Sequence, residues 1–130
     1  MITIIKKDNN DLVNLESPQS GCWIDALNPS AEEMGYLEKK FGVPKEFLVS
    51  CLDPDEISRA ETHNDISMFI FRVPCRTDNS KIEVIPIGVI LTTDALITAR
   101  LKETDVIKDF YDGKTKSFQT NEKVNFLLQI

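Results

Sequence analysis

A long hairpin pattern between residues 66 and 93 constrains the fold more than any other feature of the sequence. The segment ISMFIFRVP (66–74) is strongly apolar, and KIEVIPIGVILTT (81–93) is rich in β-branched residues. Between them stand the polar residues TDNS (77–80), which favour a tight turn. We therefore expect two paired strands, and hence a fold built around a β-sheet.

The rest of the chain alternates between strand-like and helix-like patterns. Strands are predicted at 1–7, 22–27 and 95–101, and RAETHN (59–64) forms either a separate strand or one strand with 66–74. A helix follows Ser30, whose hydroxyl can form a capping box with Glu33, and it ends at Gly42. Shorter helices are expected at 43–52 and 104–113. The predicted fold class is α/β (α+β): one domain with a mixed β-sheet flanked by helical layers.

Size and charge limit the possible functions. A chain of 130 residues with 42% hydrophobic and 28% charged residues is expected to form one globular domain. The net charge is −6, and no basic face is apparent, which argues against nucleic-acid binding. The longest apolar run, IPIGVIL (85–91), is much shorter than the roughly 18–20 residues that cross a bilayer.

The residues that usually carry catalysis are sparse. No glycine-rich phosphate loop occurs, and His63 is the single histidine. Three cysteines, Cys22, Cys51 and Cys75, lie far apart and are expected to be reduced and buried. One histidine and three dispersed cysteines do not suit a zinc site, and His63 is expected on the surface or on an edge strand. The sequence therefore predicts a protein that is not an enzyme.

An acidic stretch, CLDPDEISRAETHND (51–65), holds five carboxylates and Arg59 as the one base. Asp53, Asp55 and Glu56 stand close enough in sequence to bind a hard cation such as Mg²⁺, which takes one or two carboxylates and retains several waters. The other interpretation is a solvated turn whose Asp side chains bond local N–H groups. Spacing alone favours the turn.

The last segment, TNEKVNFLLQI (120–130), is predicted to begin a helix. Val124, Leu127 and Leu128 would form its apolar stripe, and no capping residue follows them. A helix that stops on its apolar face suggests that the chain is part of a longer protein.

Several of these segments, taken in order, resemble the CorA-type divalent-cation transporters. WIDALNPSAEEMGYLEKKFGVPKEFL (23–48) resembles the start of the family's cytoplasmic N-terminal domain. LDPDEISRAETHNDISMFIFRVP (52–74) is similar to a second family passage, PIGVILTTDALITARL (86–101) to a strand pair, and NEKVNFLLQI (121–130) to the start of the long stalk helix.

The resemblance implies a specific architecture and function. Residues 1–119 would form the cytoplasmic α/β domain, and residues 120–130 would begin the stalk helix. Family members are homopentamers in the plasma membrane that carry Mg²⁺, sometimes Co²⁺ or Ni²⁺, and a related branch carries Zn²⁺. Such a chain would sit at the cytoplasmic face and regulate cation-dependent gating. Its membrane contact would come only from segments beyond residue 130, and alone it would be a monomer or a weak dimer.

The family's regulatory metal site departs from its usual form in this sequence. Family members place a carboxylate at the end of the short helix, where this chain has Val49 and Ser50. Asp53, Asp55 and Glu56 stand a few residues further on and are the candidate substitutes. The alternative function is a free-standing acidic domain of similar fold that binds cations or a partner.

Overall fold

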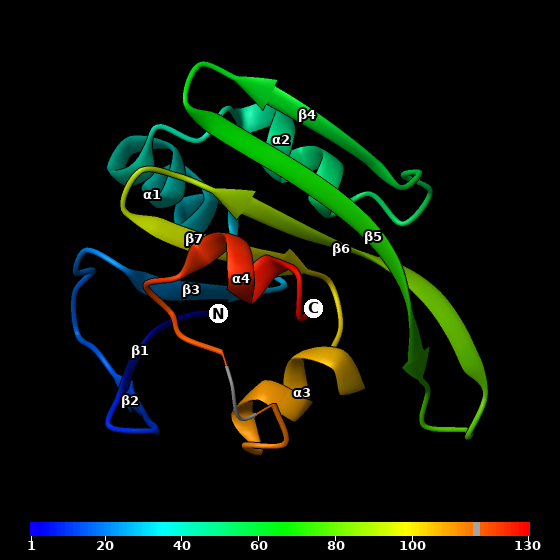
Figure 1. Ribbon diagram of the computed structural model, residues 1–130. Helices are drawn as coiled ribbons and strands as arrows, with labels where there is room; N and C mark the ends of the chain where they lie inside the picture. The colour runs from blue at the N-terminus through cyan, green and yellow to red at the C-terminus, as the bar shows by residue number, and fades with distance from the viewer. Residues whose placement is uncertain (116–117) are drawn as a thin grey trace.

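The computed structural model describes residues 1–115 and 118–130 as a seven-stranded mixed sheet with four helices (Figure 1). The strands are β1 (Ile2–Asp8), β2 (Asp11–Asn14), β3 (Cys22–Leu27), β4 (Arg59–His63), β5 (Ile66–Arg76), β6 (Ile82–Leu91) and β7 (Ala95–Arg100). The helices are α1 (Ala31–Phe41), α2 (Lys45–Cys51), α3 (Asp105–Tyr111) and α4 (Lys123–Leu127). This confirms the predicted fold class.

The sheet has the order β2-β1-β3-β7-β6-β5-β4. Its one parallel pair is β3 with β7, and the other neighbours are antiparallel. A parallel pair requires a long crossover. Here the crossover contains α1, α2 and the whole β4–β5–β6 meander, which places β3 and β7 at the centre of the sheet.

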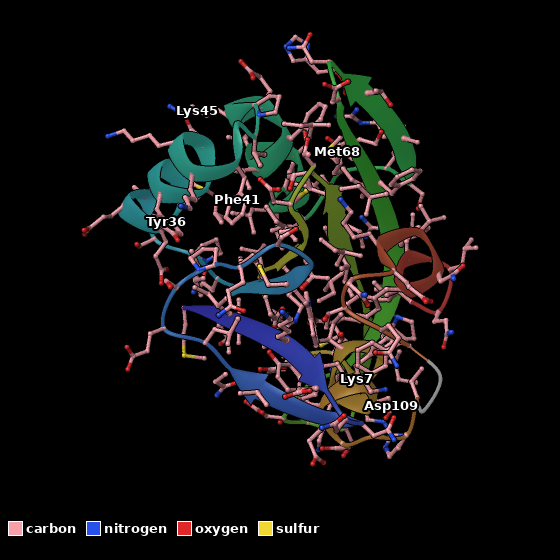
Figure 2. The ribbon with its side chains drawn as sticks, turned by 60° about the vertical axis from the view of Figure 1, so that its left-hand side comes forward. Lys7, Tyr36, Phe41, Lys45, Met68 and Asp109 are labelled. Atoms are coloured by element: carbon pink, nitrogen blue, oxygen red, sulfur yellow. The ribbon has the colours of Figure 1, made fainter. Side chains whose placement is uncertain are left out.

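Helices cover both faces of the sheet. On one face α1 and α2 pack over a cluster that includes Leu37, Phe47, Leu48 and Met68. Figure 2 shows Phe41 and Met68 on the side where α1 faces the sheet, while Lys45 points outward. On the other face, α3 and α4 lie over a second cluster, which contains Trp23, Phe110, Phe118, Phe126 and the apolar residues of β6.

Local sequence signals explain the position of α1. The Ser30 hydroxyl accepts a hydrogen bond from the Glu33 N–H, and the Glu33 carboxylate accepts one from the Ser30 N–H. Gly42 then ends the helix with a φ of 69°, a left-handed conformation that glycine adopts without steric cost. Both termini of this predicted helix are confirmed.

The hairpin of β5 and β6 is the longest pairing in the sheet and turns at residues 77–81, as the sequence predicts. Ahead of it, Asn64 and Asp65 form a turn, and Asn64 has a φ of 52°. The segments 59–64 and 66–74 are therefore two strands and not one. His63 ends the edge strand β4 and is exposed, and all three cysteines are buried and free, as predicted.

The apolar stripe predicted for the C-terminal segment is wrong for Val124 and Leu128, whereas Leu127 packs against the second cluster. Within α4 the buried side chain is Phe126, whose ring lies 5.1 Å from the Trp23 ring, while Val124 and Leu128 are 60% and 78% exposed. Phe126 is buried because it packs into the aromatic cluster beneath α4. Burial in this helix therefore depends on tertiary contacts and does not follow the i, i+3, i+4 pattern. In the part of the chain that the structure describes, no helix has the length and apolarity to span a bilayer.

Candidate functional site

The acidic residues singled out from the sequence lie in the connection between α2 and β4. Asp53 Oδ1 accepts a hydrogen bond from the main-chain N–H of Asp55 at 2.9 Å, and the Glu56 N–H donates to the Asp53 carbonyl at 3.1 Å. These bonds form a tight turn around Pro54. The Asp53 and Asp55 side chains are exposed, so both carboxylates are open to solvent.

Two arginines hold this turn against the sheet. Arg59 donates from Nε to Glu56 Oε1 at 3.2 Å, from Nη2 to Ser50 Oγ at 3.1 Å, and also pairs with Glu61. Arg72 of β5 donates to the carbonyls of Pro54 and Glu56 at 3.0 and 2.8 Å. The connection is therefore fixed in position, although its surface is exposed.

Glu56 is less open to a cation than its two neighbours. The hydrogen bond from Arg59 lowers the pKa of the Glu56 carboxyl below its ordinary value, and its Oε1 also accepts from the Ile57 N–H at 3.1 Å. Residues 1–115 and 118–130 contain no group of three His, Cys, Asp or Glu side chains placed to hold a metal ion. The turn thus presents two exposed carboxylates that lack a basic partner among the described residues, Asp53 and Asp55, and one, Glu56, that is paired with arginine.

Val49 and Ser50, the positions at which the CorA resemblance implies a carboxylate, carry no charge in this chain. Val49 is 51% exposed on α2. The Ser50 hydroxyl is half-buried and accepts the hydrogen bond from Arg59. Of the three candidates from the sequence, Asp53 and Asp55 are therefore the two without an arginine partner among the described residues.

A buried polar network that the sequence analysis did not identify lies at the other side of the sheet. Asp25 of β3 and Arg100 of β7 form an ion pair and are only 4% and 0% exposed. The Thr98 hydroxyl donates to Asp25 Oδ1 at 2.7 Å, and the Tyr111 hydroxyl donates to Asp25 Oδ2 at 2.8 Å. The Tyr111 residue is 39% exposed, but partial desolvation of its hydroxyl and the nearby Asp25 carboxylate raise the pKa of Tyr111 well above its ordinary value.

This network closes the junction between the parallel strands and α3. The Trp23 indole N–H donates to the Thr98 hydroxyl at 2.9 Å, and Arg100 reaches the exposed Glu103 at 3.0 Å. A pocket of about 700 Å³ borders Asp25 and Tyr111, but the Asp25 oxygens are already occupied by protein donors. The network therefore has a structural role, because its contacts join β3, β7 and α3. Its sequence signal is a single charged residue in each of two apolar strand patterns, within CWIDAL and at the end of ALITAR.

The fold is similar to the folds of several solved protein structures. The chain has a TM-score of 0.78 to the soluble domain of CorA from Methanocaldococcus jannaschii, with 22% identity over 98% of this chain and 52% of that one. The complete CorA magnesium transporter of the same organism gives 0.78 and 21% identity, covering 98% of this chain and 42% of the transporter. The ZntB cytoplasmic domain from Vibrio parahaemolyticus gives 0.71 and 16% identity, over 97% and 59%.

The family assignment comes from the sequence. Residues 18–130 match the family model described as CorA-like Mg²⁺ transporter protein. The cobalt/magnesium transport protein CorA from Methanocaldococcus jannaschii is 32% identical over 76 residues, which is 58% of this chain and 23% of that protein. The chain belongs to the CorA-like Mg²⁺ transporter family. It spans about half, or less, of the CorA chains that it matches.

Proposed function

We propose that this chain is the cytoplasmic regulatory domain of a CorA-like transporter that carries Mg²⁺ across the plasma membrane. The observation that carries the proposal is the similarity of 98% of the chain to a CorA soluble domain, together with the family match over residues 18–130. The membrane-spanning part would be supplied by segments outside these 130 residues. In this proposal the domain transmits the level of cytoplasmic Mg²⁺ to the pore and performs no catalysis.

The cargo would be a hydrated divalent cation. The family description gives Mg²⁺, and the curated relative's name adds cobalt, so Co²⁺ is the second candidate. Ni²⁺ and Zn²⁺ are further members of the same charge class. The proposed assembly is a homopentamer in which equivalent domains lie side by side at the cytoplasmic face.

The proposed sensor is the exposed turn that contains Asp53 and Asp55. Mg²⁺ keeps most of its waters and is commonly bound through one or two carboxylates. We propose that the regulatory cation lies between neighbouring subunits, where the exposed Asp53 and Asp55 carboxylates of one chain could share it with groups of the next. Glu56 would contribute charge to this surface while Arg59 holds its carboxylate in place.

Gating would follow from differential cation binding. In a ring of five subunits the acidic turn of one subunit faces a different surface of its neighbour. If that surface is also acidic, the two repel each other, and a bridging Mg²⁺ removes this repulsion. A ligand shifts the balance between two conformations only if it binds one of them more tightly than the other. If the bridged arrangement occurs only in the closed pentamer, Mg²⁺ binds the closed state more tightly, and a high cytoplasmic Mg²⁺ concentration favours closure. Loss of the cation would then shift the pentamer from the closed state toward the open state.

The test is a triple neutralisation, Asp53→Asn, Asp55→Asn and Glu56→Gln, in the complete transporter. We expect Mg²⁺ uptake to persist and its inhibition by internal Mg²⁺ to weaken, measured with an intracellular Mg²⁺ indicator. The control is the triple variant Asp8→Asn, Asp11→Asn and Glu16→Gln, which removes the same charge from exposed positions near β1 and β2. Equal inhibition in both variants and the wild type would remove the sensor proposal.

A further inference from the structure

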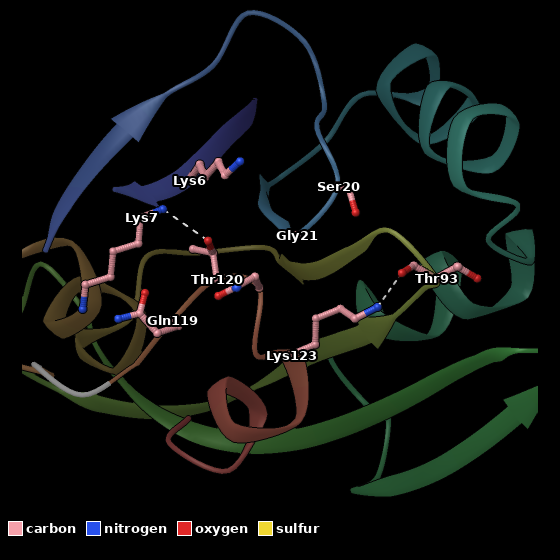
Figure 3. Close-up of a pocket in the computed structure, with 9 residues that line it drawn as sticks. Lys6, Lys7, Ser20, Gly21, Thr93, Gln119, Thr120 and Lys123 are labelled. Carbon is pink, nitrogen blue, oxygen red and sulfur yellow. Dashed lines mark hydrogen bonds between the residues drawn. The ribbon is translucent and has the colours of Figure 1, made fainter. Parts of the chain in front are cut away.

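A polar pocket of about 450 Å³ lies where β1, the turn before β3, the β6–β7 turn and the start of α4 meet (Figure 3). Its lining includes Lys6, Ser20, Thr93 and Lys123, and none of the lining residues is acidic. This is notable in a chain whose net charge is −6. The pocket is separate from the acidic turn between α2 and β4.

The lysines at this pocket differ from the others in the structure. Lys6, Lys7 and Lys123 are half-buried, whereas every other lysine among residues 1–115 and 118–130 is exposed. The Lys7 ammonium is directed toward Phe118, 2.8 Å from its carbonyl oxygen and 4.3 Å from the centre of its ring. Figure 3 shows it pointing away from Lys6 and Lys123, which lie on either side of the turn at Ser20 and Gly21.

The charges of Lys6 and Lys123 have no acidic partner in the described part of the chain. The Lys123 ammonium donates to the carbonyls of Thr92 and Thr93 at 2.5 and 2.6 Å, and Lys6 has one long contact of 3.4 Å with Gln19 Oε1. Partial burial of a cation costs free energy unless an opposite charge offsets the loss of water. Two such cations at one pocket therefore favour the binding of an anion.

Side-chain hydroxyls would supply the remaining contacts. Ser20 and Thr93 line the same pocket and can donate to an oxyanion, while lysine binds phosphate as a point charge. The main-chain N–H of Gly21 is not available, since it donates to the Asp94 carbonyl at 2.7 Å. The Asp94 side chain is exposed and does not line the pocket.

We propose that this pocket binds a small phosphate-type anion through Lys6, Lys123 and the hydroxyls of Ser20 and Thr93. The anion would join β1 to the first residue of α4, and so hold the segment 119–123 against the sheet. This inference is independent of the proposed transport function. Since ligand binding to the folded state alone stabilises that state, a saturating anion should also raise the melting temperature of the chain.

The first experiment measures binding of orthophosphate and pyrophosphate to the 130-residue chain by isothermal titration calorimetry. Ser20→Asp places a negative charge in the pocket without removing a lysine contact, and we expect it to weaken binding by about tenfold or more. Lys6→Gln should weaken it as well. The matched controls are Asn79→Asp in the β5–β6 turn and Lys39→Gln on α1, both at exposed positions, and both should bind like the wild type.

Absence of binding at millimolar pyrophosphate, or equal binding by the Ser20→Asp and Asn79→Asp variants, would overturn the proposal. A second arm distinguishes the source of the phosphate group, using vesicles of phosphatidylglycerol against vesicles of phosphatidylcholine. Selective binding to phosphatidylglycerol that Ser20→Asp abolishes would support the site with a lipid headgroup as its ligand. Binding to soluble phosphates alone would support a free anion.

Discussion

Asp25 and Arg100 form a buried ion pair across the parallel junction of β3 and β7, although 75 residues separate them in the sequence. Thr98 and Tyr111 complete the hydrogen bonding of the Asp25 carboxylate. The pair joins the two central strands to α3. Removal of one partner would leave the other charge buried without compensation.

The first prediction follows from this pair. Asp25→Ala should lower the free energy of unfolding by about 3–5 kcal/mol, because the Arg100 guanidinium would stay buried and unpaired. Lys114→Ala, which breaks the exposed pair with Asp109, should cost at most about 1 kcal/mol. Urea denaturation followed by Trp23 fluorescence measures both. Similar small losses of unfolding free energy in the two variants would show that the buried pair does not stabilise the fold as proposed.

The second prediction concerns the close contact between α2 and β6. A Cβ at Gly88 would lie 1.9 Å from Cys51 Sγ and 2.5 Å from Cys51 Cβ, so Gly88→Ala must displace the helix and should cost roughly 1–3 kcal/mol or more. Gly35→Ala is the control, since no atom beyond its chain neighbours and the backbone of its own helix lies within 4 Å of the added Cβ. In helix α1 it should raise stability by about 0.5–1 kcal/mol. Opposite signs for the two variants are expected in thermal or urea unfolding.

The third prediction is the chemical inertness of Cys51. Burial raises the pKa of the Cys51 thiol to about 12, so almost no thiolate exists at pH 8. We expect iodoacetamide to leave Cys51 unmodified in the native chain and to alkylate it rapidly in urea, as read by mass spectrometry of peptides. Rapid native-state modification at Cys51 would contradict the packing of α2 on β6.

The fourth prediction is a difference in stability at alkaline pH. The pKa of Tyr111 is raised in the folded state, so the unfolded state releases this proton first, near pH 10. Its contribution to stability is therefore complete below about pH 10 and decreases as the pH rises further. The Tyr111→Phe variant should lose less stability than the wild type between pH 9 and 11. Parallel curves of stability against pH for the two proteins would show that the pKa of Tyr111 is not raised in the folded state.

Local signals made much of the fold predictable. The capping box of Ser30 and Glu33, the left-handed Gly42 and the turn at residues 77–81 each depend on residues close in sequence. The strand β2 was missed because it has four residues, of which only Leu12 is half-buried, and hence no clear alternation. The burial of Phe126 in α4 was missed because it depends on Trp23, which lies on a distant strand.

The candidate sites show the same division between local and distant contacts. Asp53-Pro54-Asp55 indicated the turn after α2, and the turn is present. Its attachment by Arg72 depends on strand pairing and is not visible in the local pattern. The Asp25–Arg100 pair likewise requires the parallel pairing of β3 and β7, which no short motif encodes.

We propose that this chain is part of a Mg²⁺ transporter, and Mg²⁺ uptake tests this proposal most directly. The complete protein that contains these residues would be produced in cells that lack their own Mg²⁺ uptake systems, and internal Mg²⁺ would be followed after a step in external Mg²⁺. We expect uptake that slows as internal Mg²⁺ accumulates, and faster, less inhibited uptake in the variant neutralised at Asp53, Asp55 and Glu56. A complete, membrane-inserted protein that carries no Mg²⁺ would contradict it.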